Sequence, residues 1–259
     1  MADLFAPGYA TTLVLLACRL GGMMLIAPVF SAKTVPMRMR TGLLLLLTLV
    51  LAPTAHAAAQ RGAGPVLTPQ TFLSETLIGF AIGFGAAVLV GATETAGDLM
   101  STAIGLSGAS LLDPLTGGSS SALAQFGQLF AVTVLLAVNG HLVMLDAIAE
   151  SARALPVGHV VDVQAGLGAL LAEASTLFVL GLRFAAPVIG ASMIGNVALA
   201  VLSRAAPQLN VLTVAFPLQI GIGLVAIVAS LAFIATWMTG WGTALQGTIE
   251  HAFKMMVPR

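Results

Sequence analysis

The stretch of the chain richest in glycine and serine reads GLSGASLLDPLTGGSSS at residues 105–121, and long apolar segments flank it on both sides. It holds four glycines, five serines and one proline, and neither lysine nor arginine. Glycine and proline disfavour a helix interior, and serine and aspartate favour caps and turns, so the sequence predicts a break between helices here. Irregular backbone at membrane depth is stable only where protein buries it or where it lines a wet cavity. The stretch is therefore either an ordinary connection or a loop that lines or closes a pore, and its residues alone leave both alternatives open.

The composition of the 259 residues places the chain in a membrane. Hydrophobic residues make up 58%, charged residues only 8%, and the mean hydropathy is +1.04. Soluble domains carry about 25% charged residues, so this chain cannot solvate its own surface. The net charge of zero gives no electrostatic basis for binding nucleic acid. Cys18 is the only cysteine, which excludes an internal disulfide and a thiolate metal cluster.

The apolar segments have the length of membrane helices. They lie at about 9–30, 41–59, 72–91, 123–145, 169–195 and 211–237. Each approaches or exceeds the roughly 20 residues that cross a bilayer as a helix. Apolar and polar residues do not alternate within them as they do in the strands of a membrane barrel. The predicted fold class is therefore all-α, a polytopic helical membrane protein.

Four charged residues interrupt these apolar segments: Arg19, Glu75, Glu173 and Arg183. A charge at the bilayer centre costs about 2.5–3.5 kcal/mol on insertion scales, and such residues usually face protein or water. Arg19 and Arg183 lie far from the segment ends. We expect them to pair with carboxylates or helix C-termini at the seams between subunits, with Glu75 and Glu173 as candidate partners.

Two further patterns suggest that the chain packs tightly within an assembly. Gly79 and Gly83 have the GxxxG spacing that lets helix backbones approach closely, although generic membrane packing is the more common origin of such spacing. Basic residues in the loops tie at four on each side of the predicted topology, so the positive-inside rule gives no orientation. This tie indicates that a partner sets the topology or that some segments are hairpins that never span fully.

A catalytic or metal-binding set is not recognisable. The histidines are His56, His141, His159 and His251, and no second histidine stands three or four residues from any of them. The sequence has no HExxH, GxSxG, Walker A or CxxC motif. We therefore expect no enzyme activity and no cofactor.

Four strings, in the same order along nearly the whole chain, carry a family likeness. The first is RLG at 19–21 with APVF at 27–30, VP at 35–36 and RMR at 38–40, and the second is ETLIGFAIGF at 75–84. The third is LDP at 112–114 with NGH at 139–141 and SARALPVG at 151–158, and the fourth is Asn196 with SRAAPQLNV at 203–211 and FPL at 216–218. Together they resemble the FliR/SctT family of type III secretion export-gate subunits, and the length and short C-terminal tail favour the flagellar branch.

The resemblance implies a fold and a set of partners. Members assemble with FliP and FliQ, near FlhB and FlhA, into a pore in the bacterial inner membrane at the flagellar basal body. Unfolded flagellar substrates cross that pore, and the flagellum requires it. The helices form kinked hairpins, residues 1–165 being FliP-like and 166–259 FliQ-like. One such chain closes the ring, and membrane lipid surrounds the gate.

The resemblance also assigns roles to residues. It implies that residues 105–121 plug the resting pore, with these as the plug residues: Gly105, Leu106, Ser107, Gly108, Leu111, Leu112, Asp113, Pro114, Leu115, Gly117 and Gly118. Glycines give such a loop conformational freedom and leucines seal it against water. Subunit assembly and packing would depend on Arg19, Pro28, Glu75, Gly79, Gly83, Arg183, Arg204, Pro207, Gln208 and Asn210. Turn chemistry between the last two helices is the other interpretation of the final four.

Other functions stay open at this point. An injectisome SctT-type export-gate subunit is the nearest alternative. A stand-alone secondary transporter would have broken helices at related positions in two halves. Pro28 and Pro187 each follow an arginine, but the two halves do not otherwise repeat. An intramembrane enzyme would need a nucleophile and base, and no such pair is visible.

Overall fold

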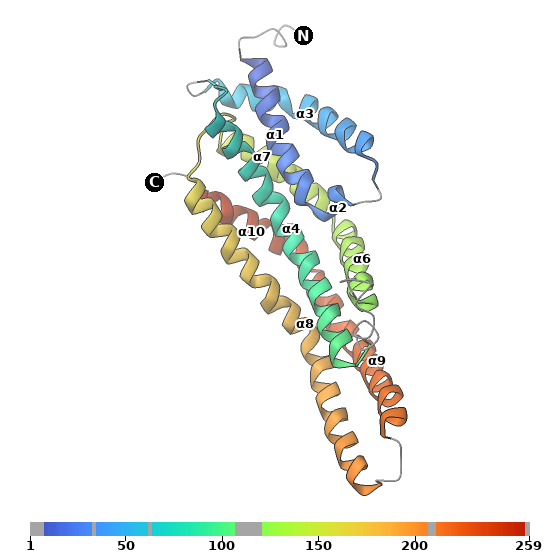
Figure 1. Ribbon diagram of the computed structural model, residues 1–259. Helices are drawn as coiled ribbons and strands as arrows, with labels where there is room; N and C mark the ends of the chain where they lie inside the picture. The colour runs from blue at the N-terminus through green and yellow to red at the C-terminus, as the bar shows by residue number, and fades with distance from the viewer. Residues whose placement is uncertain (1–7, 33–34, 62–63, 107–120, 207–210, 257–259) are drawn as a thin grey trace. The chain divides into compact units, whose positions relative to one another are not determined.

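The computed structural model describes residues 8–32, 35–61, 64–106, 121–206 and 211–256. Within these ranges every regular element is a helix and no strand occurs, which confirms the predicted all-α fold (Figure 1). In chain order the helices are α1 (Tyr9–Ile26), α2 (Pro28–Ser31), α3 (Met37–Ala59), α4 (Pro69–Ala103), α6 (Ala122–Ala137), α7 (Gly140–Ala154), α8 (Val163–Ala205), α9 (Val211–Met238) and α10 (Trp241–Met256).

The helices gather into two compact units that do not follow the order of the chain. Unit 1 comprises residues 1–88, 135–174 and 241–259, and unit 2 comprises residues 89–134 and 175–240. Helices α4 and α8 each begin in unit 1 and end in unit 2. The division into a part spanning 1–165 and a part spanning 166–259 comes from the family likeness and remains a prediction.

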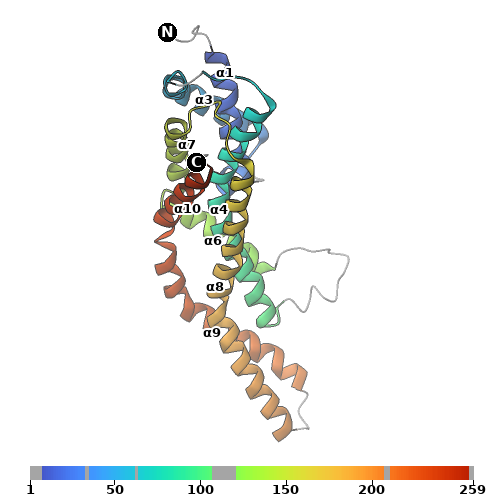
Figure 2. The same ribbon diagram turned by 90° about the vertical axis from the view of Figure 1, so that its left-hand side faces the viewer.

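Unit 1 packs around α1, α3 and α7. In it α1 lies against α3, α3 against α7, and α7 against α10 (Figures 1 and 2). The first helix ends at Ile26 because the residue before a proline disfavours helical backbone, and Ala27 is extended (φ −63°, ψ 120°) before Pro28 opens α2. Apolar residues spaced four apart bury one face of α10: Trp241, Leu245 and Ile249. The predicted apolar segments did not include α10, since its remaining face is polar.

Unit 2 is built from the C-terminal part of α4, most of α6, a long stretch of α8 and all of α9. Small residues set its helix contacts. A Cβ added to Gly181 of α8 would lie 3.2 Å from the Ala92 carbonyl of α4, and one added to Gly195 would lie 3.0 Å from Ile222 of α9. The ring of Phe184 on α8 meets that of Trp237 on α9 edge to face, with centroids 4.9 Å apart.

Five of the described helices are long and apolar enough to cross a membrane: α1, α3, α4, α8 and residues 215–238 of α9. A sixth span results if α6 and α7 count as one broken segment. The predicted segment at 123–145 contains this break, at Asn139, whose positive φ of 58° ends one helix before the next begins. Pro187 and Pro217 do not end a helix, because α8 and α9 continue through both residues. Neighbouring helices and local adjustment make proline tolerable inside membrane helices.

Candidate functional site

The ends of the stretch at 105–121 lie in unit 2, at the tip of a tightly packed hairpin of α4 and α6. A Cβ added to Gly97 of α4 would lie 2.6 Å from both the Cα of Ala124 and the carbonyl oxygen of Leu123 on α6. One added to Gly127 of α6 would lie 2.9 Å from the Thr93 carbonyl on α4. The contacts run in opposite directions along the two helices, so α4 and α6 are antiparallel, and only glycine permits this backbone approach.

Asp98 links the two ends of the hairpin connection. Its Oδ1 accepts a hydrogen bond of 3.1 Å from the backbone N–H of Ser121. The Ser121 hydroxyl in turn accepts one of 3.1 Å from the N–H of Ala124, which makes Ser121 the N-cap of α6. At the other end Gly105 takes a left-handed φ of 81° as the chain leaves α4. The carboxylate of Asp98 on α4 thereby bonds the residue that caps α6.

Helix α9 holds the first end of the connection from the side. The amide Nε2 of Gln219 donates a 3.0 Å hydrogen bond to the Ala103 carbonyl at the end of α4. Ile104 is fully buried, and a Cβ added to Gly223 of α9 would collide with its side chain. Sequence reasoning missed Gln219, although it directly follows the FPL string at 216–218 that carries the family likeness.

Most of the predicted plug residues lie outside the described residues. Gly105 and Leu106 are described, and Leu106 is 41% exposed just beyond the turn at Gly105. Those outside the described ranges are Ser107, Gly108, Leu111, Leu112, Asp113, Pro114, Leu115, Gly117 and Gly118. Their role therefore stays a prediction.

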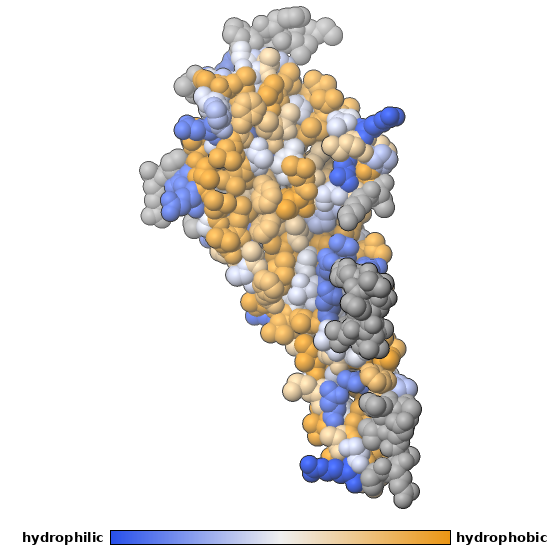
Figure 3. Space-filling view, in the orientation of Figure 1, coloured by the Kyte–Doolittle hydropathy of each residue, from blue (hydrophilic) through white to orange (hydrophobic). Residues whose placement is uncertain are grey.

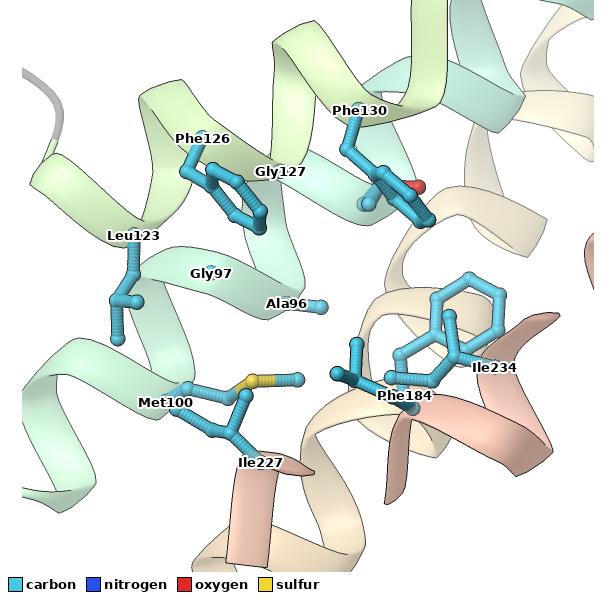
Figure 4. Close-up of a pocket in the computed structure, with 12 residues that line it drawn as sticks. Ala96, Gly97, Met100, Leu123, Phe126, Gly127, Phe130, Phe184, Ile227 and Ile234 are labelled. Atoms are coloured by element: carbon cyan, nitrogen blue, oxygen red, sulfur yellow. The ribbon is translucent and has the colours of Figure 1, made fainter. Parts of the chain in front are cut away.

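An apolar cavity of about 60 Å³ lies beside this hairpin, within unit 2 (Figure 4). Phe126 and Phe130 of α6 stack on one side of it with ring centroids 6.2 Å apart, and Met100 and Phe184 face it from α4 and α8. Because its walls are apolar, it can take only apolar groups and offers no ligand to a metal or polar cofactor.

A second cluster, in unit 1, is a buried ion pair between α1 and α4. Arg19 and Glu75 are both fully buried, and Nε of Arg19 donates to Oε2 of Glu75 at 2.6 Å. The other guanidinium nitrogens donate to the Ser151 hydroxyl at 2.9 Å and the Leu155 carbonyl at 3.1 Å. The second carboxylate oxygen of Glu75 accepts the N–H of Gly158 at 2.8 Å. This Arg19–Glu75 cluster thereby ties α1, α4 and α7 to the segment that follows α7.

Of the two candidate partners, Glu75 is confirmed as the carboxylate that pairs with Arg19, and the fully buried pair lies inside unit 1, not at a seam between subunits. The two glycines predicted to pack closely lie directly beside the pair. A Cβ on Gly79 would collide with the Arg19 carbonyl, and one on Gly83 would lie 2.7 Å from the Met23 carbonyl. Both approaches join α4 to α1 within unit 1, so the close packing at the GxxxG spacing is made inside the chain.

The remaining predicted assembly residues are dispersed. Pro28 opens α2, while Arg183 and Arg204 lie exposed on α8. Arg183 has no bonding partner among the described residues, so its expected ion pair is not found there. The predicted contact residues Pro207, Gln208 and Asn210 lie outside the described ranges.

One buried histidine was given no role by the sequence. His56 of α3 is 6% exposed, and its Nδ1 lies 3.0 Å from the Thr12 hydroxyl, while its Nε2 lies 2.8 Å from the Gln60 amide nitrogen. The Tyr9 ring meets the imidazole edge to face at 5.2 Å. The four-residue spacing of His56 and Gln60 was the available signal for this helix-surface pair. In the part of the chain that the structure describes, no group of three or more His, Cys, Asp or Glu side chains could hold a metal ion.

Comparisons with a protein-family model and with individual proteins point to the same family. The family described as "Bacterial export proteins, family 1" matches residues 10–243. The flagellar biosynthetic protein FliR of Escherichia coli (strain K12) is 31% identical over 212 residues, covering 81% of this chain and 80% of that protein. The FliR of Caulobacter vibrioides is 31% identical over 228 residues, covering 85% of this chain and 88% of its own length.

A relative named as part of a secretion system is also similar. The secretion system apparatus protein SsaT of Salmonella typhimurium is 34% identical over 149 residues, which are 56% of each chain. The family match covers most of both units, and the two FliR proteins match the chain over more than four fifths of its length. The chain therefore belongs to family 1 of the bacterial export proteins, the family of the flagellar biosynthetic protein FliR.

Proposed function

We propose that this chain is a non-catalytic subunit of the flagellar type III protein-export gate in the bacterial inner membrane. With FliP and FliQ, and beside FlhB and FlhA, it forms the pore through which unfolded flagellar substrates leave the cytoplasm. Flagellum assembly requires it. The observation that carries this proposal is the family match over residues 10–243, which runs through every helix from α1 to the start of α10.

The α4–α6 hairpin is the part of the chain that we assign to gating. Gly97 and Gly127 fix the two helices in close antiparallel contact, and Asp98 and Gln219 hold the ends of the connection. A closure element needs fixed ends and a sequence that can rearrange between them when substrate arrives. We propose that residues 105–121 plug the resting pore, their leucines excluding water and ions.

Co-expression with the FliP and FliQ of the same bacterium tests the assignment. We expect a tag on this chain to retrieve both proteins, and native mass spectrometry to give a complex with one copy of it. The matched control places the tag on an unrelated polytopic protein expressed with the same two subunits. A lone chain or homodimer, in a detergent that preserves known gates, would favour a stand-alone transporter instead.

Deletion of residues 106–116 tests the plug separately. We expect raised ion leak in cells that contain the complete gate, because the deletion removes the apolar part of the connection. The same deletion in cells without FliP is the control and should leave the leak unchanged. Equal leak with and without the deletion in the complete gate would reject the plug while leaving the subunit assignment intact.

An injectisome subunit is the second candidate function, and the similarity to SsaT favours it. Complementation separates the two. A flagellar subunit restores swimming to a strain of its own species that lacks this gene, and its loss leaves effector secretion unchanged. The reverse pattern would assign the chain to an injectisome.

A further inference from the structure

A groove runs along one flank of unit 1, where the end of α1, helix α2 and the first turns of α3 meet. Its volume is about 490 Å³, which lies within the range of small-molecule sites. Met24 and Phe30 form one apolar wall, and Leu43 and Leu46 of α3 form the other. Gly42 leaves room between them, because a Cβ added there would meet nothing within 4 Å. The groove can therefore hold a slender apolar group such as an acyl chain.

The mouth of the groove is cationic. Arg40 lines it, and Arg38 lies exposed in the same first turn of α3. The whole sequence from residue 4 to residue 74 has no aspartate or glutamate. The first acidic residue after it, Glu75, is committed to Arg19 inside unit 1. No carboxylate from this part of the chain can therefore neutralise the two arginines.

The hydrogen bonds of Arg40 leave its charge uncompensated. Its Nη2 donates to the Ser31 carbonyl at 2.9 Å and also to the Ala32 carbonyl, which fixes the guanidinium at the end of α2. Its Nε is buried and has no acceptor among the described residues. Because its acceptors are neutral carbonyls, a half-buried cation remains at the groove mouth, and an anion beside it would be stabilised.

The surroundings of the groove are those of a membrane surface. Only 33% of the membrane-length window of α3 is buried, and Leu45, Leu49 and Val50 are each more than half exposed. Hydrophilic side chains gather at the edge of this otherwise apolar region in Figure 3. The arginines stand at the first turn of a spanning helix, where headgroups lie, and its unbonded N–H groups also favour an anion.

We propose that this groove binds an anionic phospholipid. One acyl chain lies between Phe30 and Leu46, and the phosphate is held by Arg38 and Arg40. A lipid supplies in one molecule the apolar length that the walls need and the negative charge that the mouth needs. A zwitterionic lipid fits the walls but brings no net charge. This site does not depend on the export function.

Native mass spectrometry of the full chain, titrated with phosphatidylglycerol or phosphatidylcholine, tests the proposal. We expect tighter binding of phosphatidylglycerol. Arg38→Gln and Arg40→Gln should each weaken it about fivefold, and together roughly thirtyfold, since one arginine near an anionic surface contributes about 1 kcal/mol. Binding of phosphatidylcholine should not change. Arg153→Gln removes an exposed arginine from α7 and should leave both affinities as they are.

Two further variants keep the outcome decisive. Arg38→Gln alone tests the charge if loss of the Arg40 contacts to α2 disturbs folding. Gly42→Phe fills the groove without touching the arginines and should weaken both lipids. Equal affinity of the unaltered chain for the two lipids would overturn the proposal. If the arginine variants then also lost a protein subunit from the assembled complex, the counter-charge would belong to that neighbour.

Discussion

Removing Arg19 should strongly destabilise unit 1. Arg19 and Glu75 are both fully buried, so Arg19→Met leaves a carboxylate in the interior with one remaining donor, the N–H of Gly158. Breaking a buried pair from one side costs about 3–5 kcal/mol. For a chain of this size each kcal/mol lowers the melting temperature by about 2–4 °C, so the expected loss is roughly 6–20 °C.

The lone cysteine provides the assay. Cys18 is partly buried and adjoins Arg19 on α1, so a thiol-reactive dye reports the opening of this part of the protein during heating. Arg153→Met is the matched control: it removes an exposed arginine from α7 and should shift the transition by no more than about 2 °C.

A double-mutant cycle isolates the pair. Glu75→Gln keeps an acceptor for Gly158 but removes the charge, and it should cost as much as Arg19→Met. The double variant should be more stable than the sum of the single losses predicts, by about 2 kcal/mol, because neither charge is then left alone. Additive losses, or a single variant that melts within 2 °C of the unaltered chain, would refute the reasoning.

Three further outcomes follow from the helix contacts. Gly97→Val should lower the melting temperature sharply, since its Cβ would lie 2.6 Å from the Leu123 carbonyl, and an unchanged transition would contradict the close hairpin. Gly190→Ala, where a Cβ meets nothing within 4 Å, should stabilise α8 by about 0.5–1 kcal/mol in the same melting assay. Gln219→Leu removes the donor to the Ala103 carbonyl, and hydrogen exchange at residues 103–106 should then quicken by roughly 5- to 150-fold, for a loss of about 1–3 kcal/mol.

The sequence predicted that Arg19 and Glu75 need partners, but it did not predict that they pair with each other. Charges at Arg19 and Glu75 inside apolar segments indicated partners, because an isolated membrane charge is too costly. The two residues are separated by 56 positions, and no local periodicity relates them. Their pairing depends on how α1 crosses α4, which the glycines at 79 and 83 permit but do not specify. The sequence alone therefore does not distinguish Glu75 from Glu173 as the partner of Arg19.

Segment boundaries were the weaker part of the prediction. The apolar segment at 72–91 covers little more than the first half of α4, a helix of 35 residues whose later turns carry Glu94 and Asp98. Those polar residues look like a helix end in a hydropathy pattern, whereas α4 continues through both of them and Asp98 accepts a hydrogen bond from the N–H of Ser121. The sequence analysis did not predict α10, because apolar residues at every fourth position bury one face of the helix without raising its mean hydropathy.

Helix α8 has an exposed apolar surface that is longer than a bilayer is thick. Its strongly exposed apolar side chains extend from Leu167 to Leu202, about 53 Å along the helix axis. A hydrocarbon core of about 30 Å, even crossed at a tilt of 40°, covers only about 39 Å. More than two turns of exposed apolar surface on α8 must then contact water or another protein. Hydrophobic mismatch therefore destabilises the unassembled chain in the bilayer. Relief of that mismatch favours its binding to other subunits soon after insertion.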